Sequence, residues 1–252
     1  MKIATQALEG KVAELLGVLY VRRLAQLHAL TLANLLDKNP YLYRAIGIRR
    51  ADHFLDGLLA ARISSSDETI FGNEFFEPLA LWAAEHAQIP GRKVSVGAGA
   101  GQDISIESAT EYYAISVKSG KNIFNSQSNK GQNAEFDQLE ARLKKLKKAF
   151  HKVVGFGYGR QAIPKYSKPV MKKAGQEFWE LLTGEPDFYI RISDAISKPA
   201  TIHKATFDEA ILKKHAELLR QFMIHFVEAD GTVLWQKVVE FNSASGKRKR
   251  IV

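Results

Sequence analysis

Two short segments most constrain how this chain can fold: 103–107, in which polar and apolar residues alternate, and 111–118. Alternation with a period of two is typical of β-strands that bury one face. In the first segment the alternation places Asp103 and Glu107 on the same face. The second segment is aromatic and β-branched and ends at Lys118. With only a short turn between them, the two segments predict a β-hairpin.

Pairing within that hairpin would bring Lys118 close to Asp103. A carboxylate beside a lysine suits a site that holds Mg²⁺ through oxygen ligands, while the ammonium orients or deprotonates a water molecule. The simpler alternative is that Lys118 is a solvated residue on an edge strand and that Asp103 caps a turn. Acid and lysine pairs at this spacing are common by chance, so the pair alone leaves both interpretations open.

The arrangement of Asp103 with Ser116-Val117-Lys118 resembles the PD-(D/E)XK nuclease superfamily. Other blocks resemble one type II restriction endonuclease subfamily, the PmeII-like enzymes. These blocks lie between about residues 38 and 190: Lys38–Ala45, Ser64–Asn73 with Glu77, Ser116–Gly120 with Asn122, Asn125 and Gln127, Gly155–Arg160, and Phe178–Tyr189.

The resemblance implies an α/β fold with a central mixed β-sheet flanked by helices, preceded by a helical N-terminal region. We expect one nuclease domain over 1–252, with a helical region at 1–62, a catalytic core at 63–190, and a C-terminal helix and strand at 191–252. The implied activity is Mg²⁺-dependent hydrolysis of phosphodiester bonds at a specific sequence in double-stranded DNA. A homodimer and a cognate DNA methyltransferase are the implied partners, and the cytoplasm of a prokaryote is the implied location.

For the catalytic residues, the resemblance assigns Asp103 as the central metal ligand and Lys118 as the lysine of the motif. The superfamily has an acid two positions before the lysine, where this chain has Ser116. A second carboxylate must therefore come from elsewhere, and Glu107 and Glu77 are both candidates. The resemblance also implies a metal contact from the backbone carbonyl of Val117. Without the family resemblance, Glu77 would be interpreted as a surface charge on a helix.

The segment after Lys118 is rich in amides and hydroxyls, which can bond to phosphates or base edges, although a solvated loop explains its composition equally well. Its position after the predicted catalytic strand favours DNA contact. The candidate DNA-binding residues are Ser119, Lys121, Asn122, Asn125, Gln127, Lys130, Arg160 and Lys165.

Composition limits the alternatives. The net charge of +9 favours a polyanionic partner. The absence of cysteine excludes disulfides, Cys-ligated zinc and thiol nucleophiles. We expect neither a secretion signal nor a transmembrane helix, since no apolar run approaches the roughly 20 residues that a bilayer requires. A repair or recombination nuclease of the same fold, or a non-catalytic DNA-binding protein, remains an alternative.

Periodicity and breaker residues predict the other elements. The sequence predicts two helices within 6–36, and further helices over 50–61, 67–87 and 135–150. The helix over 135–150 would have a basic face, formed by Arg142, Lys144, Lys145, Lys147 and Lys148. A last helix is predicted from a capping box at Thr206–Glu209 to about Val227. The sequence also predicts strands over 153–159 and 232–241, and an irregular basic stretch over 160–173.

Overall fold

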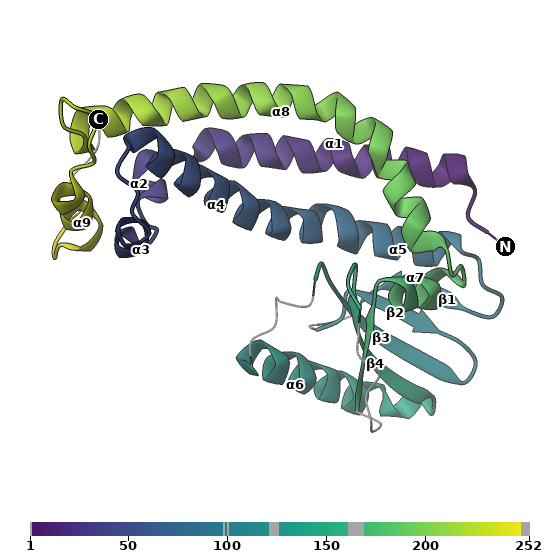
Figure 1. Cartoon of the computed structure of the whole chain (residues 1–252). Helices are drawn as coiled ribbons and strands as arrows, with labels where there is room; N and C mark the ends of the chain where they lie inside the picture. The colour runs from purple at the N-terminus through teal and green to yellow at the C-terminus, as the bar shows by residue number, and fades with distance from the viewer. Residues whose placement is uncertain (1, 98, 100, 121–125, 161–168, 248–252) are drawn as a thin grey trace. The chain divides into compact units, whose positions relative to one another are not determined.

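The computed structural model describes residues 2–97, 99, 101–120, 126–160 and 169–247. The chain divides into two compact units (Figure 1). Unit 1 consists of Met1–Leu19 and Thr69–Ala200, and unit 2 consists of Tyr20–Glu68 and Thr201–Val252. Each unit is described by itself below.

Unit 1 contains a five-stranded sheet in the order β1-β2-β3-β4-β5. The strands are β1 (Lys93–Val96), β2 (Ile104–Glu107), β3 (Glu111–Lys118), β4 (Ala149–Phe156) and β5 (Val170–Ala174). β1, β2 and β3 pair antiparallel, whereas β3, β4 and β5 pair parallel. The predicted hairpin and the predicted mixed sheet are both confirmed.

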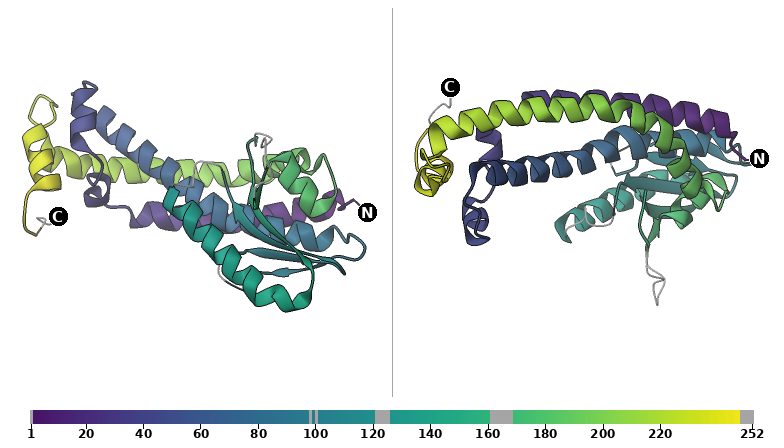
Figure 2. Two further views of the ribbon diagram at one scale, coloured as in Figure 1. Left: turned by 90° about the horizontal axis from the view of Figure 1, so that it is seen from below. Right: turned by 45° about the horizontal axis from the view of Figure 1, so that its top comes forward.

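Helices cover both faces of this sheet (Figure 2). On one face, Phe136 and Leu139 of α6 (Ser126–Leu143) pack against Tyr112, Ala114 and Val154. The other face carries the larger core of unit 1. Its buried residues include Ile104, Ile106, Ile115 and Val117 of the strands, with residues from the start of α1 (Thr5–Ala29), from α5 (Glu77–His86) and from α7 (Gln176–Thr183). The central strands of the sheet are thus buried on both faces, as expected for an α/β fold.

The register of the parallel strands shows which residues lie at the carboxyl edge of the sheet. Lys118 lies beside Phe156 of β4, which in turn lies beside Ala174 of β5. These residues are the carboxyl ends of their strands. In open α/β sheets, ligands bind outside the carboxyl ends of strands. Lys118 is therefore at the edge where a substrate site is expected.

The helix leading to this edge is longer than the sequence suggests. Residues expected to separate two helices, 62–66, are helical within α4 (Ala51–Phe71). A π-helical turn, η1 (Gly72–Phe76), then joins α4 directly to α5. Pro78 is in the first turn of α5, where a missing backbone N–H costs little. The prediction of a break between the two helices is wrong, because no cap or glycine interrupts the backbone hydrogen bonds there.

Unit 2 is helical. It contains α2 (Leu32–Leu35), α3 (Pro40–Ala45), α9 (Trp235–Ser243), most of α4, and the later part of α8 (Phe188–Phe226). Its core includes an aromatic cluster in which the ring of Phe54 lies 5.4 Å from that of Phe222 and 5.0 Å from that of Trp235. No helix in the described ranges of the chain is long and apolar enough to span a membrane.

Three predictions for the later chain need correction: one expected strand is a helix, and two expected helices have other bounds. The expected strand 232–241 is largely helix α9, and the expected capping box at Thr206–Glu209 is inside α8. The expected helix 135–150 ends at Leu143, is followed by a 3-10 turn at Lys144–Leu146 (η3), and gives way to β4 at Ala149. For α9, burial in tertiary packing outweighs local propensity, because Val238 is fully buried in the helical core.

These changes also alter two basic segments. The cations between Arg142 and Lys148 do not form one helical face, since the helix ends among them and Lys147 has a left-handed backbone (φ +54°). Lys172 and Lys173, expected in irregular chain, belong to β5.

Candidate active site

The β2–β3 hairpin brings Asp103 and Lys118 together. The backbone N–H of Asp103 donates to the carbonyl of Ile115 at 2.8 Å, which places Asp103 at the mouth of the paired strands. Lys118 is the last residue of β3, and its Nζ is 3.8 Å from Asp103 Oδ2. The predicted proximity of the two side chains is confirmed. Both remain partly exposed, with side-chain accessibilities of 25% for Lys118 and 35% for Asp103, so a substrate can reach them.

The Asp103 carboxylate is oriented by the neighbouring strand. The backbone N–H of Val117 donates to Oδ2 at 2.6 Å, and the Ser116 hydroxyl donates to the same oxygen at 3.3 Å. Ser116 occupies the position where the nuclease pattern has an acid. Here it supports the carboxylate of Asp103 instead of adding a second one. Hydrogen bonds from two donors restrict the rotamers of Asp103 before any ligand arrives.

Glu77 reaches the same site from a different element. It is the first residue of α5, directly after the π-helical turn. Partial burial raises the pKa of Glu77 above its ordinary value; the negative charge of Asp103 raises it further, and Lys118 lowers it. These couplings mean that Glu77 lies within electrostatic reach of both residues. A Cβ on Gly72 of the π-turn would be 3.4 Å from the Ser119 side chain, so this turn packs against the chain just beyond Lys118.

Glu107, the other candidate carboxylate, lies at the opposite end of β2. It pairs with Tyr112 in the register of the hairpin, and its Oε1 accepts a hydrogen bond from Lys148 Nζ at 2.6 Å. It is four positions along the strand from Asp103, a distance of about 13 Å. The structure therefore brings Asp103 and Lys118 together and sets Glu77 within electrostatic reach of both, whereas Glu107 is not near them.

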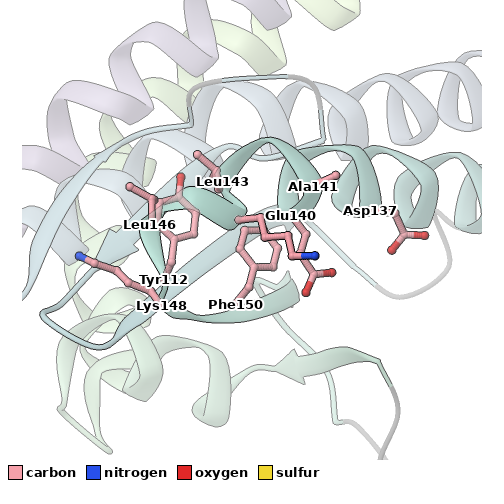
Figure 3. A pocket seen from close by; sticks show the side chains of 9 residues that line it. Tyr112, Asp137, Glu140, Ala141, Leu143, Leu146, Lys148 and Phe150 are labelled. Atoms are coloured by element: carbon pink, nitrogen blue, oxygen red, sulfur yellow. The ribbon is translucent and has the colours of Figure 1, made fainter.

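Lys148 also lines a cavity of about 400 Å³ at that far end of the sheet, shown in Figure 3. The cavity lies over the stacked rings of Tyr112 and Phe150, whose centroids are 5.5 Å apart, and beside Asp137 and Glu140 of α6. Lys152 forms ion pairs of 2.6 Å with both acids. The ionic groups of this end thus pair with one another.

The candidate DNA-binding residues have varied locations. Ser119 is buried at 3% exposure, whereas Lys130 on α6 and Arg160 just beyond β4 are exposed. Gln127 belongs to α6, and its side chain is not among those described. Lys121, Asn122, Asn125 and Lys165 lie outside the described residues.

The donor set at the Asp103 edge fits a divalent cation that keeps several water ligands. Among the described residues, no group of three or more His, Asp or Glu side chains is arranged to hold a metal ion. Mg²⁺, however, commonly binds through one or two carboxylates and retains water. The raised pKa of Glu77 reflects its partial burial first and the nearby negative charge of Asp103 second. A bound cation would offset that repulsion, so Asp103 and Glu77 are suitable ligands.

Sequence reasoning did not identify the π-helical turn or the role of Ser116. The available signal was the run Phe75-Phe76-Glu77-Pro78, in which an acid follows two aromatic residues that are buried in the structure.

No curated protein matches the chain. A family model described as type II restriction endonuclease EcoO109I matches residues 6–203, well over half of the sequence. The chain therefore belongs to the EcoO109I family of type II restriction endonucleases.

Proposed function

We propose that this protein is a Mg²⁺-dependent endonuclease that cleaves double-stranded DNA at a specific sequence, with its catalytic site at Asp103, Lys118 and Glu77. The observation that carries the proposal is the 3.8 Å approach of Lys118 Nζ to an Asp103 carboxylate that is oriented by Val117 and Ser116. Membership in a restriction endonuclease family supports nuclease activity. PD-(D/E)XK membership is the superfamily assignment that we infer from Asp103 and Lys118, and the PmeII-like subtype stays a prediction.

In this proposal Asp103 and Glu77 hold the metal ion, with the backbone carbonyl of Val117 as a further oxygen donor. Bound Mg²⁺ supplies a Lewis acid that polarises the scissile phosphate and lowers the pKa of a water molecule. The backbone N–H of Val117 keeps Asp103 directed toward this site. Glu107 is a structural residue in this account, because Lys148 already engages it.

Lys118 has a different role from the carboxylates. Its Nζ donates hydrogen bonds to the attacking water or to the phosphate oxygens, and its charge offsets the negative charge that develops during in-line attack. It is well placed for this because it terminates β3 at the open edge of the sheet. Exposed Arg160 and Lys130 provide positive charge for DNA phosphates, and the net charge of +9 agrees with a polyanionic substrate. Ser119 is buried, so its side chain is poorly placed to contact DNA.

Cleavage of both strands of a symmetric site favours a homodimer, and protection of the host genome requires a cognate DNA methyltransferase. Both are expectations of this function. A repair or recombination nuclease of the same fold is the alternative, and it would prefer ends, branches or mismatches to a fixed sequence.

The test is incubation of the purified protein with plasmid and genomic DNA, with Mg²⁺ or with a chelator. The proposal expects discrete fragments that require Mg²⁺, and sequencing of the fragment ends would give the recognition site. A metal-dependent smear would favour the alternative nuclease. Intact DNA that shifts in a mobility gel would instead indicate a binding protein without catalysis.

A further inference from the structure

A second cavity, of about 710 Å³, lies within unit 1 between the residues that follow β4, the end of β5 with the start of α7, and the first part of α8. This volume is in the range of sites that hold small organic ligands, about 300–1,000 Å³. Its lining combines aromatic and polar groups: Phe76, Gly157–Arg160, Ala174–Glu177, Trp179, Tyr189, Ile192, Ser193 and Ile196. The mechanism described above uses none of its side chains for chemistry.

The cavity adjoins the candidate catalytic strand. The backbone N–H of Gly157, in its wall, donates to the carbonyl of Lys118 at 2.9 Å. Two residues beyond Lys118, a Cβ on Gly120 would meet the Tyr158 hydroxyl at 2.4 Å, so Tyr158 lies directly against the chain that leaves the site. A ligand in the cavity would therefore be a near neighbour of a DNA strand bound at Lys118.

The aromatic groups divide into a fixed floor and accessible rings. Trp179 is buried, and its indole N–H donates to the Gly157 carbonyl at 2.8 Å, which fixes the ring. Phe76 is also buried, with its ring 6.1 Å from that of Trp179. Tyr158 and Tyr189, by contrast, are 49% and 40% exposed. Exposed aromatic rings beside a buried aromatic floor are suited to stacking on a flat ring system.

Two glycines allow the wall of the cavity to pack closely. A Cβ at Gly157 would lie 2.8 Å from the ring of Phe76, and one at Gly175 would lie 2.6 Å from the Gly159 carbonyl oxygen. Gly175 also has a left-handed backbone (φ +53°). Side chains at these positions would displace the wall, so the glycines are needed for its shape.

The charges at the cavity favour a phosphate at its rim. Arg160 is exposed and lines the cavity. Glu177, the acidic residue of the lining, lies 3.9 Å from Lys173 Nζ, which offsets its charge. An aromatic lining that includes a guanidinium suits a nucleotide, because aromatic rings stack on bases and arginine binds phosphate.

We propose that this cavity receives one base of the DNA substrate that has left the base stack, held between Tyr158 and Tyr189, with Arg160 at an adjacent phosphate. The inference rests on the proposed function, and it names a contact of the same DNA beyond the cleaved bond. A paired base shows only its edges in the grooves, so a ring can stack fully on tyrosine only after unstacking. Unstacking is least costly for a base that is already unpaired.

The test compares two duplexes that are identical except that one carries a single extrahelical nucleotide. Binding is measured with a chelator present, so that the DNA stays intact. We expect the protein to bind the bulged duplex about tenfold more tightly, the effect of stacking one base on an aromatic ring. Tyr189→Leu should abolish that preference, whereas Tyr189→Phe should keep it because the ring remains.

Two further variants separate stacking from a structural effect. Tyr41→Leu changes an exposed tyrosine of unit 2, and it should leave the preference unchanged. Ser193→Trp fills the cavity from the exposed face of α8, and it should abolish the preference even if Tyr189→Leu lowers the melting temperature.

Equal affinity of the wild-type protein for the two duplexes would overturn the inference, and so would a preference that survives in both Tyr189→Leu and Ser193→Trp. If that happens while Mg²⁺-dependent cleavage is observed, the nuclease function stands and only the base pocket fails. If the preference depends on Tyr189 but DNA is never cleaved, the base pocket stands and the proposed function fails.

Discussion

An acid and a lysine lie at each end of the β2–β3 hairpin, one of the lysines being Lys148 just before β4, yet the two pairs differ in their surroundings. At one end, Lys148 Nζ contacts Glu107 at 2.6 Å and also donates to the carbonyl of Ser108. At the other end, Lys118 Nζ stays 3.8 Å from Asp103, while Val117 and Ser116 satisfy the carboxylate. A lysine engaged by two close acceptors stabilises the fold, whereas a lysine beside an already bonded carboxylate is available to a substrate.

The largest expected effect separates the two lysines. We expect Lys118→Met to lower the rate of DNA cleavage by about 10²- to 10⁴-fold, the usual contribution of a positioned catalytic group. Lys148→Met is the matched control, because it removes the same charge at the other end of the sheet, and it should keep most of the activity. Initial cleavage rates measured at saturating DNA give the comparison. Equal losses in the two variants would show that the ends are not functionally distinct.

Asp103→Asn should also abolish most cleavage, because the amide is a far poorer ligand for Mg²⁺ than the carboxylate. DNA affinity should stay the same or rise, since a negative charge near the phosphate backbone is removed. Parallel cleavage and mobility-shift measurements check both expectations. A variant that loses binding and cleavage together would indicate that Asp103 maintains the hairpin rather than the chemistry.

Glu77→Gln and Glu107→Gln compare the two candidate carboxylates. We expect Glu77→Gln to require a higher Mg²⁺ concentration for half-maximal cleavage, because one metal ligand is weakened. Glu107→Gln should leave that concentration unchanged and lower the free energy of unfolding by about 1 kcal/mol, since Lys148 loses a charged partner in a part-buried pair. Mg²⁺ titrations and chemical denaturation measure the two effects. If Glu107→Gln raised the Mg²⁺ requirement and Glu77→Gln did not, Glu107 would be the functional carboxylate.

The smallest expected effect concerns charges that touch only DNA phosphates. Arg160→Ala should reduce the slope of log affinity against log salt concentration by about 1, the value for one lost phosphate contact. Lys144→Ala removes an exposed charge from the other end of the sheet and should leave that slope unchanged. Binding of one duplex over a series of salt concentrations distinguishes the two. A larger change in the salt slope for Lys144→Ala than for Arg160→Ala would indicate that DNA binds at the Glu107–Lys148 end of the sheet instead.

Local pattern predicted the hairpin because alternation and a short turn are properties of neighbouring residues, and the register then placed Lys118 near Asp103. The choice between Glu77 and Glu107 could not be read from the sequence. Glu77 reaches Asp103 only through the continuous path of α4, η1 and α5, which is set by packing. The same is true of α9, whose valines favour a strand locally but bury Val238 in a helical core. The aromatic cavity could not be predicted from the sequence either, because its walls come from segments far apart in the chain.

The most direct test of the central claim replaces Mg²⁺ with Fe²⁺ and generates hydroxyl radicals, which cut the polypeptide close to the bound metal ion. Mass spectrometry of the fragments locates the cuts. The account predicts cuts near Glu77, Asp103 and Val117, which excess Mg²⁺ suppresses. Cuts centred on Glu107 and Lys148, or none that depend on the metal, would contradict a metal site at the carboxyl edge of the sheet.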